Sequence, residues 1–305
     1  MDLEFLNGIY HVKTGNILTE DDFNTLKRLG RPMFFRYLRT KDYGHNSGYE
    51  SIEKIIETEL CNVRVELDQT ANDNLISDIF FMENDLTNMK IIYKEVATGI
   101  KGSNFSRLRR FDQDALYEFF KYGNYKMLPK EHEELFKAIN LIPLDYEIQD
   151  YLQALEKVTF NYYTKLAKSK KVYKALVEYL ELKKGINNLL TLLKFKYKKA
   201  NIDLFSNALL EETYVGKDIW LAIYESSNRV ILDKLSLYFN VQLTEAISNY
   251  IDNHDIEEFR IELSKYVYEN IKYLSYNSNT IGPIIYYLYL KEIESLKVRE
   301  LYYEE

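Results

Sequence analysis

The chain has 305 residues, of which 46% are hydrophobic and 29% charged, a composition typical of a folded protein with a sizeable core. This length suits two or three domains or subdomains, and the few breakers, 11 Gly and 4 Pro, favour an all-α fold. The formal net charge of -7 argues against a dedicated nucleic-acid binder, because such proteins need positive charge to neutralise phosphates. Cys61 is the single cysteine, so no disulfide can form within the chain. One cysteine also supplies too few ligands for a zinc site.

The first hundred residues have the pattern of helical hairpins. Thr19 and Asp22 have the spacing of a capping box, in which a hydroxyl and an acid satisfy first-turn amides. Pro32 ends or redirects the helix that begins at this capping box, because the residue before a proline is pushed away from helical geometry. Apolar residues at three- and four-residue spacing then predict a helix over 52–60 and one long helix over 75–93.

A segment with Gly and Ser, residues 97–104, is the clearest linker in the sequence and ends the first unit. The second unit repeats the plan of the first. It has a short helix over 111–122, another that Pro129 opens, and a long antiparallel pair that begins near Leu152 and ends at Lys199.

The third unit starts near Gly216. A helical stripe over 256–271 covers four turns, and a turn follows at 277–282. Pro283 then opens a terminal helix that runs to Tyr303, because proline is tolerated where a helix begins. Period-2 alternation is missing throughout the sequence, so we expect no sheet. The predicted units are residues 1–102, 103–212 and 213–305.

A short helical signature recurs about every hundred residues, in the last long helix of each unit. Its three copies begin at Asp85, Gly185 and Glu294. The first, fourth and fifth positions of the signature share one helix face, where Asp85, Asn88 and Met89 form a cluster. Two interpretations are open: these residues fix the helix packing of each unit, or they contact a partner protein.

The sequence offers no convergent set of catalytic or metal-ligating residues. The four histidines lie apart, and none has a second ligand four residues away: His11, His45, His132 and His254. We interpret the acidic run around His132 as an exposed helix start. The segment 99–103 lacks the glycine spacing of a phosphate-binding loop, and we interpret it as a flexible linker. No catalytic, cofactor-binding or metal site is therefore predicted, and we expect a non-catalytic protein without a cofactor.

The stretch 161–200 is strongly basic, with eleven lysines against two glutamates and a net charge of +9. Aromatic residues are interleaved with the lysines. Two amphipathic helices that bury the aromatics and solvate the lysines explain this pattern. An electropositive patch for an acidic protein partner is a second interpretation, and stacking on a nucleic acid is a third.

Three groups of residues, in order along the whole chain, carry a family resemblance. They are Asn84-Asp85-Leu86-Thr87-Asn88 with Ala97-Thr98-Gly99, then Asn187-Asn188-Leu189 with Thr191 and Lys194, and then Lys291-Glu292-Ile293-Glu294 with Val298-Arg299. With these residues the chain resembles the C-type subunits of prokaryotic V-type (A/V-type) ATPases, relatives of the eukaryotic d-type subunits. Two departures are visible: Gly185 stands where an acid is usual, and Lys297 stands where the first two copies have Asn.

The resemblance implies an all-helical, three-fold funnel that acts as a central-stalk rotor subunit. Such a subunit has no active site and transmits torque for proton or sodium transport. The implied partners are the D and F subunits of the central shaft and the proteolipid rotor ring, with no nucleic acid. The implied location is the cytoplasmic face of the cell membrane, with membrane contact only indirect, through the ring. The alternative is a generic helical-repeat interaction scaffold outside any ATPase.

Overall fold

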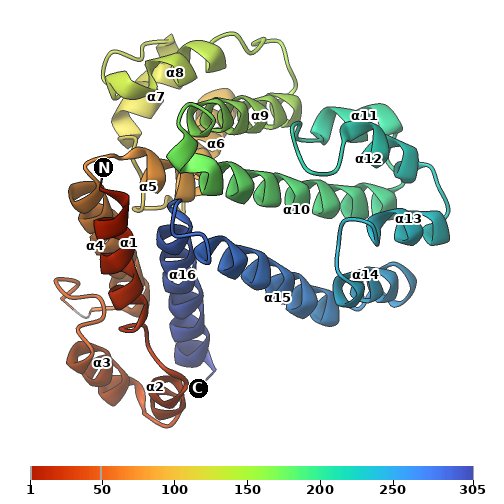
Figure 1. The fold of residues 1–305 in the computed structure, drawn as a ribbon. Coiled ribbons are helices and arrows are strands. Elements are labelled where there is room, and N and C mark those ends of the chain that lie inside the picture. The colour runs from red at the N-terminus through yellow and green to blue at the C-terminus, as the bar shows by residue number, and fades with distance from the viewer. Residues whose placement is uncertain (1, 49, 305) are drawn as a thin grey trace. The chain divides into compact units, whose positions relative to one another are not determined.

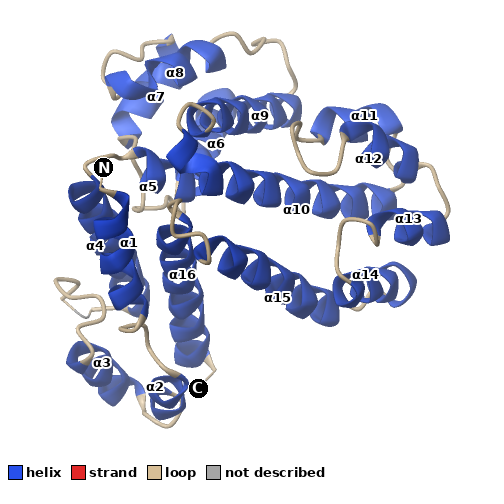
Figure 2. Cartoon of the chain, viewed as in Figure 1, coloured by secondary structure: helices blue, strands red, loops and turns tan. Residues whose placement is uncertain are grey.

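The computed structural model describes residues 2–48 and 50–304, and every regular element in these ranges is a helix (Figure 1, Figure 2). The predicted all-α class is therefore confirmed. The chain separates into two compact units, one formed by the residues up to 136 together with those from 274 on, and one formed by residues 137–273. The division into three units at 102 and 212, and the funnel, stay predictions.

The first compact unit joins the two ends of the chain. Its helices are α1 (Leu3–Thr14), α2 (Glu20–Leu26), α3 (Arg31–Thr40), α4 (Ile52–Ala71), α5 (Leu75–Phe80), α6 (Met82–Thr98), α7 (Gln113–Tyr122), the 3-10 turn η1 (Lys130–His132), the start of α8 (Glu133–Ile139) and α16 (Gly282–Tyr303). Helix α16 packs along α1 and α4 and also touches α2 (Figure 1). Residues almost three hundred positions apart thus share one core.

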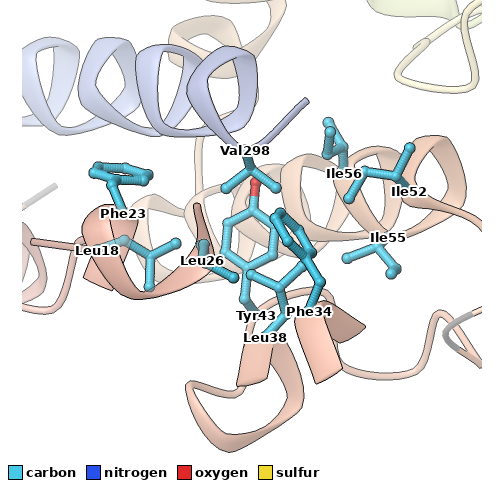
Figure 3. Packing of buried hydrophobic residues seen from close by; sticks show 10 residues of the cluster. All are labelled: Leu18, Phe23, Leu26, Phe34, Leu38, Tyr43, Ile52, Ile55, Ile56 and Val298. Carbon is cyan, nitrogen blue, oxygen red and sulfur yellow. The ribbon is translucent and has the colours of Figure 1, made fainter. Parts of the chain in front are cut away.

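That shared core contains Val298 of α16 among apolar side chains from the first sixty residues (Figure 3). The cluster comprises Leu18, Phe23, Leu26, Phe34, Leu38, Tyr43, Ile52, Ile55, Ile56 and Val298. Removing such side chains from water is the main stabilising contribution, at about 1.5–3 kcal/mol for each fully buried large residue. The same apolar burial therefore holds α16 against α2, α3 and α4.

The predicted starts of α2 and α16 are confirmed. The Thr19 hydroxyl accepts a hydrogen bond from the Asp22 amide at 3.3 Å, and an Asp22 carboxylate oxygen accepts one from the Thr19 amide at 2.8 Å. This reciprocal pair is the expected capping box of α2. Pro32 and Pro283 lie in the first turns of α3 and α16, where a missing amide proton has least effect.

The helix predicted as continuous over 75–93 is instead broken at Phe81. The backbone there has φ -96° and ψ 9°, outside helical geometry, so that α5 ends at Phe80 and α6 begins at Met82. Phe80 and Phe81 are both buried, with their ring centroids 5.0 Å apart. Neighbouring side chains on a continuous helix point about 100° apart. The break allows both rings to enter the core, and periodicity alone does not reveal it.

The segment predicted as a flexible linker is held against α6. Gly99 ends that helix in the left-handed conformation, with φ 72°. The Gly102 amide then donates to a carboxylate oxygen of Glu95 at 3.1 Å, and a Cβ at Gly102 would overlap the Ile91 side chain. The flexible-linker prediction is wrong here, because these glycines serve a helix end and a close approach.

The second compact unit contains the basic stretch. Its elements are α9 (Ile148–Ala167), the 3-10 turn η2 (Lys171–Tyr173), α10 (Lys174–Lys198), α11 (Ile202–Ala208), α12 (Lys217–Tyr224), α13 (Asn228–Leu235), α14 (Val241–Asn253) and nearly all of α15 (Ile256–Ser275). Helices α9 and α10 pack as the predicted long pair. The fully buried Trp220 lies in α12, and the rings of Phe205 and Tyr224 stack at 4.3 Å. Among the described residues, no helix has the length and apolar character needed to cross a membrane.

Two glycines in the first unit should respond in opposite directions to alanine. We expect Gly282→Ala to destabilise the protein by about 1–3 kcal/mol, because its Cβ would overlap the Leu274 carbonyl oxygen. Gly8→Ala should stabilise it by about 0.5–1 kcal/mol, since Gly8 lies exposed inside α1 with no atom within 4 Å of the new Cβ. Urea unfolding followed by circular dichroism measures both changes. Equal stability of the two variants would contradict the close packing at Gly282.

Candidate functional site

The fourth position of the signature anchors the loop that follows its helix. Asn88 and Asn188 are completely buried, on α6 and α10 respectively. The Asn88 side chain accepts from the Ser106 amide at 2.8 Å and donates to the Ser106 carbonyl oxygen at 2.9 Å. The Asn188 side chain does the same with Leu210, at 2.8 Å for both bonds. An amide side chain suits this role because it carries both a donor and an acceptor.

The first position of the signature holds the same kind of backbone through an acid. A carboxylate oxygen of Asp85 accepts from the amides of Arg110 at 2.7 Å and Phe111 at 3.2 Å. A carboxylate oxygen of Glu294 accepts from the Leu18 amide at 2.7 Å. Phe111 and Leu18 each directly precede the residue that caps the next short helix, α7 and α2 respectively. The acid therefore fixes where that helix begins.

The two departures from the signature have physical reasons in the structure. A Cβ at Gly185 would lie 2.5 Å from Cε1 of Tyr214, so a tyrosine ring fills the space into which an acid would project. Lys297 reaches α2, where its Nζ lies 2.6 Å from a Glu20 carboxylate oxygen and 4.2 Å from the Phe23 ring centroid. At each departure, a different local contact thus replaces the contact that the acid or the asparagine makes in the other copies.

These contacts favour one of the two interpretations of the signature. Asp85, Asn88, Asn188 and Glu294 are each 2% exposed or less. A partner protein cannot reach side chains that are buried to this extent and occupied by backbone groups. The signature residues at these positions therefore fix the packing inside each unit.

A cluster of buried charges surrounds Asp85 in the first unit. Arg110 donates through Nε to Asp78 at 2.6 Å and through a terminal nitrogen to Asp68 at 2.7 Å. Arg64, which is 5% exposed, donates to the same Asp78 oxygen at 2.9 Å. The other Asp78 oxygen lies 3.1 Å from Nε2 of His132. The cluster joins four separate segments of the chain: α4, α5, the loop before α7, and η1.

The carboxyl groups of this cluster have opposite pKa shifts. Burial raises the pKa of Asp85 to about 6, although Arg64 and the two backbone amides oppose the shift. Burial also pushes the pKa of Asp78 upward, but His132 and Arg110 together hold it below its ordinary value. Asp78 is thus charged and surrounded by donors, whereas Asp85 is the more easily protonated acid.

The interpretation of His132 as part of an exposed helix start is wrong. His132 is 2% exposed, ends the η1 turn, and packs edge-on against the Phe111 ring, with centroids 5.2 Å apart. Its contact with Asp78 explains why a polar ring is buried at this position. In the part of the chain that the structure describes, no three His, Cys, Asp or Glu side chains are placed to hold a metal ion.

A cavity in the first unit has a volume of about 660 Å³ and polar walls. Its lysines face carboxylates: Lys13 lies 2.5 Å from Glu66, Lys41 lies 2.7 Å from Asp22, and Lys291 lies 2.5 Å from Glu59 and 2.6 Å from Glu294. Burial lowers the pKa of Lys291, but its two carboxylate partners outweigh this and raise it. Each cation is thus matched by an acid, which leaves no positive excess to hold a phosphate.

The basic stretch of the second unit follows the amphipathic interpretation in most positions, but Tyr197 is 69% exposed and two lysines are tied to other parts of the chain. Tyr163, Tyr173 and Tyr179 are buried as expected, and most of the lysines are exposed. Lys184 is instead completely buried, with its Nζ 3.3 Å from the Thr164 hydroxyl, and burial lowers its pKa. Lys196 donates to the carbonyl oxygens of residues 224 and 226, just after α12. The amino groups of these two lysines thus bind groups of the chain itself.

Sequence reasoning missed the cluster around Arg110. The signal that the sequence did contain was the acid Asp78 within the mostly apolar run from Ile76 to Phe81. Charged residues in such positions are buried only when they are paired. The partners of Asp78 come from segments up to 54 residues away, in the case of His132, and helical periodicity does not relate such segments.

Comparison with known proteins gives a family for nearly the whole chain. A family model described as "ATP synthase (C/AC39) subunit" matches residues 6–301. A search of curated proteins finds no match.

We expect Asn188→Ala to destabilise the protein by about 2–4 kcal/mol. The change leaves the buried amide and carbonyl of Leu210 without partners, and each unmade bond costs about 1–3 kcal/mol. The neighbouring Asn187 is a matched control, because its amide makes a half-buried bond to Glu156 and holds no backbone. Asn187→Ala should cost less than about 1 kcal/mol. Urea unfolding compares the two variants, and equal losses would contradict the anchoring role of Asn188.

Asp85→Asn should keep the fold but remove a pH dependence. Because burial raises the pKa of folded Asp85 from 3.8 to about 6, the folded chain takes up this proton before the unfolded chain does. The contribution of Asp85 to stability is therefore full below about pH 4 and is lost as the pH rises through 6. Relative to Asp85→Asn, the unaltered chain should gain on the order of 2 kcal/mol between pH 6.5 and pH 4.

Urea titrations at several pH values measure this difference. The control is Asp85→Ala, which leaves the amides of Arg110 and Phe111 unpaired and should destabilise the protein at every pH. If unaltered protein and Asp85→Asn change in parallel with pH, Asp85 does not titrate in this range and its assigned shift is wrong.

Proposed function

Since the chain belongs to the ATP synthase (C/AC39) subunit family, we propose that it is a non-catalytic central-stalk rotor subunit of a V-type ATPase. In this role it links the central shaft of the soluble head to the membrane rotor ring. It transmits torque between ATP turnover and the transport of protons or sodium ions. Its partners are the D and F subunits of the shaft and the proteolipid ring, and it lies at the cytoplasmic face of the cell membrane.

The family match over residues 6–301 carries this proposal. The internal contacts agree with it physically, because a part that transmits torque must resist deformation. Anchored loops and buried ion pairs stiffen the units, since each anchor ties a loop to a long helix through two or more hydrogen bonds. We further propose that the three signature copies mark three related units that form a funnel.

A non-catalytic role also agrees with how the titratable groups are used. Asp85 and Glu294 bind backbone amides, and Asp78 binds two arginines and a histidine. Groups held in this way are not presented to a substrate. The same unit shows a polar cavity in which lysines and carboxylates neutralise one another.

Deleting the chain from its cell tests the proposal. We expect membranes without it to retain ATP hydrolysis by the soluble head but to lose ATP-driven ion uptake into vesicles, because the head and the ring are no longer joined. Expressing the unaltered chain, or the Gly8→Ala variant as a matched control, should restore uptake. Mass spectrometry of the complex purified in detergent should also find shaft and ring subunits together with the chain.

Two outcomes would overturn the proposal. Ion uptake that stays coupled to ATP hydrolysis without the chain would exclude a linking role. A purified chain that brings down other proteins but no ATPase subunit would instead support the generic interaction scaffold.

A further inference from the structure

The surface around α3 concentrates positive charge in an otherwise acidic protein. Residues 27–41 contain six cations and no acid, while the whole chain has a net charge of -7. The six are Lys27, Arg28, Arg31, Arg36, Arg39 and Lys41, and all are exposed. We call these six side chains, together with Pro32, Met33 and Phe35, the α3 surface. Its charge density is higher than that of the lysine stretch in the second unit, which also contains glutamates.

The orientation of α3 is fixed by its inner face. Phe34 and Leu38 are 1% and 0% exposed and belong to the core cluster that Val298 completes (Figure 3). The opposite face carries Arg36 and Arg39, one turn apart. They line a hollow of about 450 Å³ together with Pro32, Phe35 and Thr40. Guanidinium groups and an apolar wall therefore meet at one open depression.

Internal pairing neutralises only part of this charge. Lys27 lies 3.6 Å from Glu304, Lys41 lies 2.7 Å from Asp22, and Arg31 stacks over the Tyr302 ring. Within the described residues, Arg28 and Arg36 make no ion pair. The guanidinium groups of Arg28 and Arg36 thus lie at the surface without an acidic partner in the described part of the chain.

We propose that the α3 surface binds the headgroups of anionic phospholipids. A guanidinium binds a phosphate through two parallel hydrogen bonds, and the hollow beside Arg36 offers space for one. Met33, which is 49% exposed, and the Pro32 and Phe35 wall can contact the apolar region just below a headgroup.

The charge pattern favours a membrane surface over an acidic protein. A lipid surface presents a continuous sheet of negative charge, which matches a segment with six exposed cations and no acid of its own, only two of which pair with acids from neighbouring helices. The proposed lipid contact goes beyond the proposed rotor function, in which the membrane is reached only through the ring.

Vesicle flotation with the full chain tests this proposal, and it needs no other subunit. The vesicles contain either phosphatidylcholine alone or phosphatidylcholine with 40% phosphatidylglycerol, at 50 mM salt. We expect binding only to the anionic vesicles. Each basic residue near such a surface changes binding by about fivefold, so Arg28→Gln with Arg36→Gln should weaken it about 25-fold. Raising the salt to 300 mM should also weaken it, because screening shortens the reach of the charges.

A matched control removes the same charge elsewhere. Lys165→Gln with Lys171→Gln takes two exposed lysines from the second unit and should leave vesicle binding within about twofold. Circular dichroism should show both double variants folded, since every changed side chain is exposed.

Three results would overturn the proposal: no binding of the unaltered chain to anionic vesicles, equal binding to both kinds of vesicle, or equal losses in the two double variants. If vesicle binding is absent and the arginine variant alone no longer assembles with the ATPase subunits, the α3 surface binds an acidic protein and the lipid assignment is wrong. The rotor function would survive any of these results, because it is tested by deletion and ion uptake.

Discussion

The structure depends on one recurring interaction, in which a buried side chain on a long helix binds the backbone of a distant loop. A buried peptide group without a partner costs about 1–3 kcal/mol, so a loop packed against a helix must be satisfied by that helix. Asn88 and Asn188 each satisfy both the amide and the carbonyl of one loop residue. Asp85 and Glu294 each accept from the amide of the residue just before a helix cap, of α7 and α2 respectively. The same chemical solution thus anchors loops in both compact units.

The third copy of the signature shows why the ends of the chain share a unit. The amide partner of Asp85 lies in the loop after its own helix, whereas that of Glu294 is Leu18, 276 positions earlier in the sequence. Contacts of Lys297 with Glu20 and of Arg299 with Glu53 extend the same alignment. The terminal helix therefore depends on residues near the start of the chain for its anchor. Consecutive sequence segments do not describe this contact between the two ends of the chain.

Local rules predicted the parts of the fold that depend on neighbouring residues. The capping box of α2 and the proline start of α16 need only the sequence within one turn, and they are confirmed. The break at Phe81 and the burial of His132 depend on distant partners, namely core space for two rings and the carboxylate of Asp78. Periodicity contains no information on such pairings. The signature was visible as a repeat, but its backbone partners were not, because loop residues such as Ser106 and Leu210 carry no pattern.

The pKa of Asp85 illustrates how such anchoring can be mistaken for catalysis. A buried acid with a pKa near 6 is the kind of group that performs proton transfer in enzymes. Here one of its oxygens is bound by two backbone amides, and the residue is 1% exposed. A proton donor needs a route to its substrate, and this carboxyl faces the peptide groups that it holds in place. The raised pKa is therefore the electrostatic cost of burying an acid where it can start a helix. That cost recurs at Glu294, whose pKa burial also raises while it binds Leu18.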